Sequence, residues 1–486
     1  MAQNPVPNPD PQQLTITVDG KSLPCRPDTS LAVALWDHGL RHLSHSHKYG
    51  RPRGVTCARG HCTNCLMRVD GVPNVRTCET SVRAGMVVNT QDTGTFYGAP
   101  MQKLLSLGSA WMPVGFYYKW FTRPASLSRF FLDRIRPMTG VGRLPDAVLP
   151  VRDLPVRDLP AAATDEPEQA STDLGRFATV IIGGGASGLQ AASHQSGSTL
   201  LIDDSAQAGG QRLLALRELA TDKSGALARF PTLAAALERL ESAVTALPDR
   251  PDFRCLAQAK AVAGYYPAGL LVRQGDKLMT ARFDKLVWAA GALDSIGLFP
   301  GNDTPGLFGP RAMYRLLTRD GLQVSGRHVL LVGGGFDFWL CAALLASRGA
   351  TLNLVVTESG CQSEVAAAVD LKWSLNTGLK LKEVKELGGH KLQATFEPRN
   401  GQSGLSGSRL QLEADLAVIC KPGKPAYDIP YQLGADLALV PERGGYVPRG
   451  CDATTEKTFA MTLPGGAEVI CAGETLGLSP TSQVTS

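Results

Sequence analysis

The N-terminal part of the chain shows the alternation of apolar and polar residues that β-strands require. Residues 14–18 alternate in this way, and a second extended run covers residues 21–25. The Asp-Gly pair between the two runs favours the primed turns that join antiparallel strands in a hairpin. A second strand-turn-strand pattern surrounds the Asp-Gly pair at 70–71, and a last short strand is predicted near residues 86–88.

A helix is predicted between the first hairpin and a loop rich in glycine and cysteine. Residues 28–30, Asp-Thr-Ser, offer side-chain oxygens that can cap the first turn of the apolar segment 31–40. Gly39 can end this helix in the left-handed conformation. The order of strands, helix and cysteine loop predicts a β-grasp, 2Fe-2S ferredoxin-like domain, which we assign to residues 1–98.

The second half of the chain alternates short apolar strands with helical stretches, a pattern typical of a parallel sheet with crossover helices. Two strands end in glycine-rich turns, ATVIIGGGASG and RHVLLVGGGFDF. We therefore predict an α/β protein with two dinucleotide-binding folds. The first, which binds FAD or another dinucleotide, is assigned to residues 175–325 and 420–486, and the second, of the NAD(P) type, to residues 326–419.

Composition supports a globular protein with more than one domain. The chain has 486 residues, of which 43% are hydrophobic and 19% charged. Residues 101–143 are locally basic and rich in aromatic residues, so they could bind nucleic acid or a membrane surface, or pack against protein. Packing is favoured, because aromatic residues usually mark buried contact area and no nucleic-acid motif accompanies them. A tandem PVRDL predicts a linker at 145–174, and residues 99–174 are assigned to this connecting segment.

The N-terminus lacks both the basic start and the apolar stretch of a secretory signal. The longest uncharged apolar run, residues 104–118, is shorter than the roughly 18 residues that a membrane-spanning helix needs. We therefore expect a cytoplasmic protein with no membrane span.

Four of the eleven cysteines carry the strongest chemical signal. Cys57, Cys62, Cys65 and Cys78 have the spacing C-x4-C-x2-C-x12-C, and the first three match plant-type 2Fe-2S proteins. Thiolates bind iron, and a tight glycine-containing loop lets backbone N–H groups offset the charge on sulfur. A four-cysteine zinc site or four unrelated thiols are the alternatives. Structural zinc usually shows paired short knuckles, whereas this loop has one.

The first glycine-rich turn has the full dinucleotide-binding pattern. Gly183, Gly185 and Gly188 form GxGxxG directly after a strand, and Asp203 closes the next strand, 20 residues after Gly183. The glycines allow the backbone to approach a pyrophosphate at the helix N-terminus, and the acid accepts hydrogen bonds from ribose hydroxyls. Asp204 is the second choice for that acid, and a chance glycine-rich turn is the alternative.

The second glycine-rich turn departs from the pattern. Gly333, Gly334 and Gly335 are followed by Phe338, where a third glycine is usual. A bulky side chain at this close contact between helix and strand weakens the case for a nicotinamide site. A working site and a vestigial fold therefore both stay open, and Trp339 is expected in the core.

Three further motifs resemble the two-dinucleotide-domain flavoproteins of the disulfide-reductase type. They are Gly210 and Gln211, the strand end KLVWAAGA with Gly291, and EVICAGET with Gly473 and Glu474. In that family the last motif carries Gly-Asp against the flavin, so this resemblance implies FAD, contacted by Glu474 in place of aspartate. Sequence does not decide between FAD, NAD and ATP.

Taken together, the ferredoxin-like start, MPVGFYYKWF at 112–121, GNDTPGLFGPRAMYRLL from Gly301 and the glycine motifs resemble the alpha subunit of heterotetrameric sarcosine oxidase. Relatives include alpha subunits of opine, hydroxyproline and proline dehydrogenases and of hydrogen cyanide synthase. The resemblance implies a smaller FAD-containing beta-type partner that oxidises an amine or amino acid, and FMN at the interface. The sequence stops soon after Gly477, so no folate-binding half is expected.

These observations lead to a hypothesis in which electrons pass from a partner's flavin through the flavin of this chain to the cluster and an external acceptor. The cluster accepts one electron at a time, which favours a dehydrogenase over an oxidase. An NAD(P)H-dependent reductase and a non-catalytic scaffold with a structural dinucleotide are the alternatives. We identify no catalytic base. His61 is expected to face solvent, and His42, His45 and His47 are interpreted as part of a polar loop.

Overall fold

A computed structural model describes residues 13–45, 51–90, 123–124, 126, 172–222, 225–275, 277–357, 362–399, 409–440, 445–449 and 458–472. The basic segment and linker predicted at 99–174 lie largely outside these residues. Among the described residues, none of the helices combines the length and apolar character that crossing a membrane requires.

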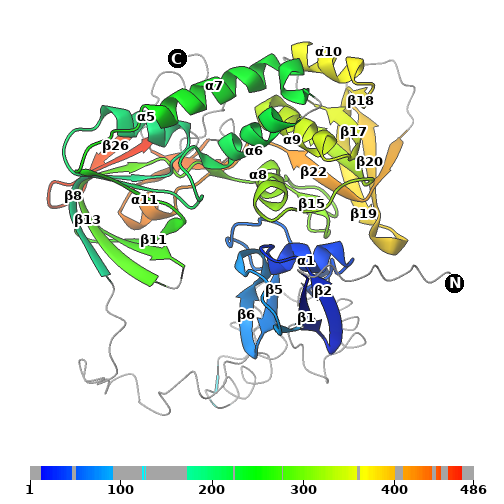
Figure 1. Cartoon of the computed structure of the whole chain (residues 1–486), viewed down its shortest axis with the longest axis horizontal. Helices are drawn as coiled ribbons and strands as arrows, with labels where there is room; N and C mark the ends of the chain where they lie inside the picture. Colours follow the sequence, from blue (N-terminus) through cyan, green and yellow to red (C-terminus); the bar gives the residue numbers. More distant parts are fainter. Residues whose placement is uncertain are drawn as a thin grey trace.

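The N-terminal domain is a five-stranded sheet with one helix packed on it (Figure 1, blue). The predicted hairpin forms between β1 (Leu14–Val18) and β2 (Lys21–Cys25), and the helix α1 (Leu31–Asp37) is capped by the Ser30 hydroxyl, which accepts from Val33 N at 3.4 Å. The strand β7 (Val87–Asn89) runs parallel to β1, between β1 and the second hairpin. This arrangement confirms the β-grasp prediction. The second hairpin is β5 (Leu66–Val69) and β6 (Val72–Arg76), followed by the single turn η1 (Thr77–Glu79), and a short ladder joins β3 (Ser44–His45) to β4 (Pro52–Arg53).

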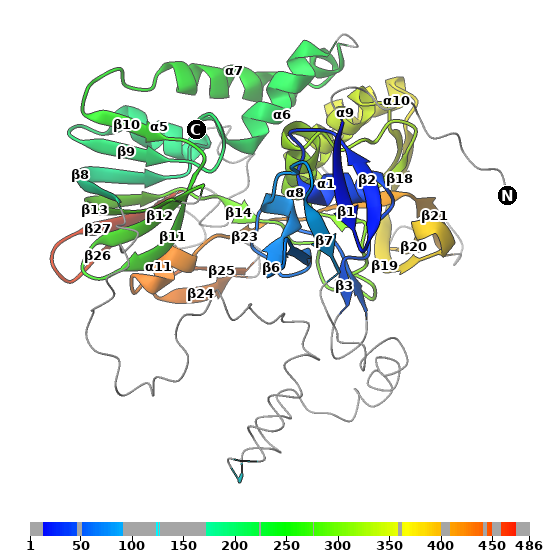
Figure 2. The ribbon, with the colours of Figure 1, turned by 60° about the horizontal axis from the view of Figure 1, so that its bottom comes forward.

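The first dinucleotide fold has an eight-stranded sheet (Figure 2). Its parallel part is β10 (Phe253–Leu256), β9 (Thr199–Ile202), β8 (Thr172–Ile182), β13 (Lys277–Trp288) and β27 (Glu468–Ala472). The antiparallel strands β11 (Ala259–Tyr265), β12 (Gly269–Gln274) and β26 (Thr458–Thr462) complete it. The helices are α5 (Ala186–His194), α6 (Gly210–Thr221), the turn η4 (Ala226–Arg229), α7 (Pro231–Thr245) and α11 (Asp428–Gln432).

The second dinucleotide fold has a five-stranded parallel sheet whose order is β15 (Leu307–Phe308), β22 (Leu416–Cys420), β16 (His328–Gly333), β17 (Thr351–Val356) and β18 (Ser374–Thr377). The strand β15 belongs to this sheet although it lies inside the range 175–325 that we assigned to the first fold. Its helices are α8 (Pro310–Tyr314), the π-helical turn η5 (Arg315–Arg319), α9 (Gly335–Ser347) and α10 (Gln362–Asp370).

A separate antiparallel sheet contains β19 (Leu379–Glu386), β20 (Leu392–Pro398) and β21 (Leu410–Ala414), with the turn η6 (Gly388–His390) between the first two strands. Two small ladders pair β14 (Ala292–Leu293) with β23 (Lys424–Pro425), and β24 (Leu437–Val440) with β25 (Gly445–Pro448).

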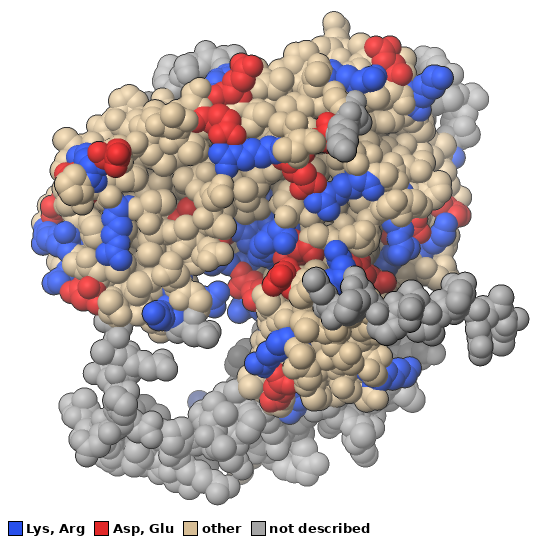
Figure 3. All heavy atoms as spheres, in the orientation of Figure 1, with Lys and Arg blue, Asp and Glu red and all other residues tan. Residues whose placement is uncertain are grey.

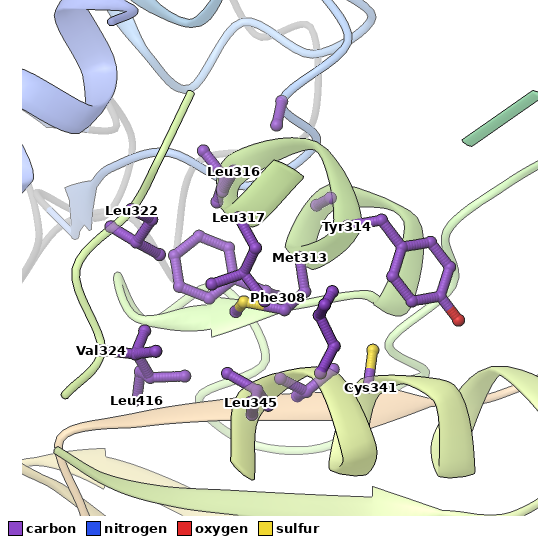
Figure 4. Close-up of a cluster of buried hydrophobic side chains, with 14 of the residues drawn as sticks. Phe308, Met313, Tyr314, Leu316, Leu317, Leu322, Val324, Cys341, Leu345 and Leu416 are labelled. Carbon is purple, nitrogen blue, oxygen red and sulfur yellow. The ribbon is translucent and has the colours of Figure 1, made fainter. Parts of the chain in front are cut away.

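The N-terminal domain packs against the second fold through an apolar contact. Trp36 of α1 meets Phe308 of β15 edge to face, with ring centroids 5.3 Å apart. Figure 4 shows Phe308 in a layer of buried side chains between the α8 and η5 turns and the helix α9, which contributes Cys341 and Leu345. This core is continuous with that of the N-terminal domain, so the cysteine loop has a fixed position relative to the dinucleotide folds.

Candidate functional site

The four cysteines of the predicted cluster lie together. Cys57, Cys62 and Cys65 come from the loop after β4, and Cys78 comes from η1. The thiols of Cys62 and Cys78 lie within hydrogen-bonding reach of the Cys57 sulfur, and the Cys78 thiol also reaches Cys65. All four are free thiols, so the donor set suits iron.

The local electrostatics already favour thiolates at two of the four positions. The thiols of Cys62 and Cys78 donate to the Cys57 sulfur and hold the pKa of Cys57 well below its usual range. The Cys78 thiol likewise lowers the pKa of Cys65 to about 7, against the effect of burial. The amide N–H of Cys62 also points at the Cys57 sulfur, at 3.4 Å. The same hydrogen bonds raise the pKa of the donating thiols, Cys62 and Cys78, so iron binding must displace their protons. Backbone N–H groups can then stabilise the charge on sulfur.

The cysteine loop is held against the first dinucleotide fold by ion pairs of Glu79, and the loop makes a tight turn at Gly60 beside this carboxylate. Gly60 has φ of +71°, and a Cβ there would lie 2.4 Å from the Glu79 carboxylate. Glu79 is paired with Lys260 and, at 3.2 Å, with Arg273, both on strands of the first fold. The Lys260 ammonium also donates to Arg59 O, at 3.2 Å. Figure 3 shows side chains of both signs gathered where the small domain meets the larger body.

The first glycine-rich turn opens into a cavity of about 330 Å³. Gly183, Gly185, Asp203 and Asp204 line it, together with Gly210, Gln211 and Gly291 from the other predicted motifs. Gly188 lies behind the turn, where a Cβ would come within 1.7 Å of Gly183 O. The structure therefore brings most of the predicted dinucleotide-binding residues to one cavity. Gly473 and Glu474 lie outside the described residues.

Two observations indicate that the cavity can hold a dinucleotide. The N-terminus of α5, which begins after Gly185, opens into it, and a helix N-terminus attracts phosphate. Two buried polar atoms in its wall, Gln211 Oε1 and Arg59 Nε, have no hydrogen-bond partner in the described part of the chain. A polar ligand would satisfy such atoms, which are costly to leave unpaired.

The two acids at the end of β9 have different partners. Asp203 accepts hydrogen bonds from Gly184 N at 2.5 Å and from Ser205 N at 2.7 Å, so it supports the glycine turn. Asp204 instead pairs with Arg315 of η5 at 2.5 Å and with Arg59 of the cysteine loop at 3.4 Å. Burial acts to raise the pKa of Asp204, but these guanidinium groups and the nearby ammonium of Lys260 outweigh it and lower the pKa to about 2.

The second glycine-rich turn is closed by the chain's own side chains. Asp337, in the first turn of α9, forms a two-pronged ion pair with Arg212, at 2.8 and 2.9 Å, and accepts from the Tyr314 hydroxyl at 3.0 Å. Phe338 is fully buried, in edge-to-face contact with Trp339, which is also buried. The N-terminus of α9 is thus next to a carboxylate of the same chain.

Several contacts of the site were missed by the sequence analysis. Arg59 lies inside the cysteine motif, Arg315 inside the segment that starts at Gly301, and Lys260 outside the motifs named above. No motif links the three residues, so only folding brings them together. His61 is exposed, as we expected. His42, which we interpreted as part of a polar loop, contacts Glu386 of the second fold at 2.8 Å.

Comparisons with known proteins agree with this architecture. Residues 11–93 match the family described as a 2Fe-2S iron-sulfur cluster binding domain. The solved structure of L-proline dehydrogenase from P. horikoshii aligns with 96% of this chain and 69% of its own, with a TM-score of 0.55 at 18% sequence identity, a likeness in fold alone. Fold and site therefore define a 2Fe-2S domain joined to a flavoprotein fold of the disulfide-reductase type, with two dinucleotide domains.

Two curated relatives specify the family. The sarcosine oxidase subunit alpha of Rhizobium meliloti (strain 1021) is 25% identical over 74% of this chain and 35% of its own length. The hydrogen cyanide synthase subunit HcnA of Pseudomonas aeruginosa is 35% identical over 16% of this chain and 74% of its own length. The chain belongs to the family of sarcosine oxidase alpha-type subunits, which includes HcnA. It spans less than half the length of the sarcosine oxidase subunits that it matches.

Proposed function

We propose that this chain is the electron-transferring alpha-type subunit of a flavin-dependent dehydrogenase complex that oxidises a secondary amine or an amino acid. In this proposal the cavity of the first fold holds FAD or another adenine dinucleotide, and the four cysteines hold the 2Fe-2S cluster. A smaller flavoprotein subunit carries the amine-oxidising site, FMN can bind between the subunits, and an external carrier takes up the electrons. The names of the relatives, sarcosine oxidase and hydrogen cyanide synthase, support this class of reaction.

One observation carries the proposal: the cysteine loop forms part of the wall of the dinucleotide cavity. Arg59 lies two residues after Cys57, and its side chain lines the cavity together with Gly183 and Gly291. The Arg59 guanidinium also donates to Ala292 O, at 3.4 Å, directly after the strand-end motif of the first fold. A cluster held by this loop would therefore lie next to whatever occupies the cavity.

The residues of the chain have separable roles in this arrangement. A bound flavin can accept a hydride, and a 2Fe-2S cluster can accept a single electron, so the pair converts two-electron into one-electron chemistry. The N-terminus of α5 and Gln211 bind and orient the dinucleotide. Arg59, Asp204 and Arg315 hold the cysteine loop at a fixed distance from the cavity. The buried core shared by α1 and β15 fixes the N-terminal domain against the second fold.

The test is to purify the chain without oxygen, alone and with a co-expressed candidate beta-type subunit. Iron, sulfide and flavin contents are measured first, followed by anaerobic addition of sarcosine, proline, hydroxyproline or an opine. The proposal expects about two irons per chain. It also expects bleaching of the flavin and an electron paramagnetic resonance signal of the reduced cluster only when the partner is present. A chain that binds no iron after reconstitution, or a cluster that no such substrate reduces in any complex, would contradict it.

The alternative of an NAD(P)H-dependent reductase receives less support. A nicotinamide site of the usual kind would place a pyrophosphate at the N-terminus of α9, where Asp337 contributes a negative charge of its own. Arg212 and Arg311, the cations near this point, are both paired with that carboxylate. Flavin reduction by NADH in the absence of any partner subunit is the observation that would favour this alternative.

A further inference from the structure

A second cluster of metal-binding side chains lies outside the cysteine loop, between the N-terminal domain and the second dinucleotide fold. It consists of His42, Glu386 and His390, whose possible ligand atoms all lie within 4.8 Å of one another. The Glu386 carboxylate lies between the imidazoles, 2.8 Å from His42 Nε2 and 2.7 Å from His390 Nδ1. We propose that these three residues form a binding site for a divalent transition-metal ion of the Zn²⁺ class, which links the two domains.

The backbone on both sides of the cluster is held firmly. Glu386 is the last residue of β19 and pairs with Leu392, so Glu386 and His390 project from the two sides of one hairpin turn. Leu387 N donates to Lys391 O at 2.7 Å and closes this turn. Two ligands four residues apart are therefore positioned by local structure before any metal binds.

The third ligand comes from the other domain, and its neighbours in the chain are also fixed. Leu43 is buried, and its N–H donates to Arg53 O at 2.8 Å. The Arg41 side chain donates to His390 O at 2.7 Å and to Asp415 O at 2.6 Å, and its guanidinium lies over the Trp36 ring. His42 is thus held between two anchored residues and faces the hairpin.

The chemistry of the donors selects the kind of ion. Two imidazoles and one carboxylate suit zinc and its neighbours in the first transition row, whereas magnesium and calcium prefer oxygen donors alone. The side chains of His42 and His390 are 32% and 38% exposed, which leaves room for water as a fourth ligand. To bind the ion, each imidazole nitrogen that now faces the carboxylate must be free of its proton, which moves to the other ring nitrogen or to solvent. The cationic side chain of Arg41 lies beside the cluster, and it interacts with the carboxylates of both Asp415 and Glu386.

The site is tested on the full chain with its iron–sulfur cluster loaded, so that the cysteines are already occupied. Zn²⁺ is titrated by equilibrium dialysis into the wild type and into Glu386→Gln and His390→Asn, with His38→Asn as the control. His38 is an exposed histidine of the same domain whose contact is with Pro24 O. We expect one zinc per chain in the wild type and the control. Loss of a residue that only supports a metal ligand can weaken metal binding roughly 100-fold. Removing a direct ligand should therefore weaken zinc binding by at least as much.

X-ray absorption at the zinc edge supplies a second measurement that does not depend on activity. The proposal expects only nitrogen and oxygen neighbours, at about 2.0–2.2 Å, and no sulfur at about 2.3 Å. Glu386→Gln preserves size and hydrogen bonding, so it separates loss of metal binding from loss of folding. The inference is overturned if the wild type binds no stoichiometric zinc, if zinc binding survives both substitutions, or if sulfur appears among the ligands. In the first case the three residues form only a hydrogen-bonded contact between domains.

Discussion

The two glycine-rich turns begin in the same way and end differently. Gly183 and Gly333 both have positive φ, and a Cβ at either would come within 2.3 Å of a carbonyl oxygen at the end of the neighbouring strand. The backbone of the two turns differs two residues after this first glycine, because Gly335 has φ of +75° whereas Gly185 has φ of −75°. A reversed sign of φ sends the chain in a different direction, so equivalent positions of the two following helices face different surroundings.

This difference between the turns explains why a third glycine is needed after one of them and a phenylalanine is accepted after the other. Gly188 faces the carbonyl of Gly183, where no side chain fits, whereas Phe338 is turned into the apolar core. The first turn remains open to a cavity, whereas the ion pair of Asp337 with Arg212 lies at the helix N-terminus of the second. The comparison teaches that a strand, a glycine-rich turn and a helix are not enough for a binding site, because the conformation of the turn and the side chains beside it decide which atoms face the ligand.

The largest effect is expected for Phe338→Ala. Removing a fully buried ring should lower the free energy of unfolding by about 4 kcal/mol, through lost burial and the cavity left behind. It should not create a nicotinamide site, because Asp337 stays at the helix N-terminus. Urea unfolding and NADH titration check both points, with Leu298→Ala, an almost fully exposed residue, as the control. A stable variant that binds NADH would show that Phe338 alone closes the turn.

A somewhat smaller effect is expected for Gly188→Ala. The added methyl would overlap a backbone oxygen, so the turn must shift at a cost of about 3 kcal/mol. Gly185→Ala is the matched variant, because a Cβ at Gly185 meets nothing within 4 Å. It should change stability by less than about 0.5 kcal/mol and weaken only dinucleotide binding, by crowding the pyrophosphate. Thermal unfolding and flavin or adenine-nucleotide titration distinguish the two, and equal stability of both variants would refute this account.

The smallest effect concerns the ion pairs that join the cysteine loop to the first fold. Folding lowers the pKa of Asp204 from 3.8 to about 2, so its contribution to stability is complete above about pH 4 and is lost as the pH falls towards 2. Asp204→Asn should therefore cost about 2 kcal/mol at pH 7 and progressively less below pH 4. Urea unfolding from pH 7 to pH 3 measures this, with the exposed Asp284→Asn as the control. A difference from wild type that does not narrow at low pH would contradict the role of this carboxylate.

Much of the fold could be predicted because local rules act within a few residues. The Asp-Gly turn set the register of β1 and β2, Ser30 capped α1, and the spacing of the cysteines predicted the thiol cluster. The glycine spacing after β8 likewise predicted the tight turn at Gly183. Each of these features depends on the conformational preference or the chemistry of neighbouring residues, which the order of residues carries directly.

Contacts between distant segments were decided only by the tertiary structure. Arg59 meets Asp204 across 145 positions, His42 meets Glu386 across 344, and neither pair has a pattern that marks it in the sequence. The second turn also depended on the positive φ of Gly335 and on Arg212, which comes from the first fold and pairs with Asp337. Charges and ring nitrogens act through distances in space, and those distances exist only after the apolar cores have packed the domains together.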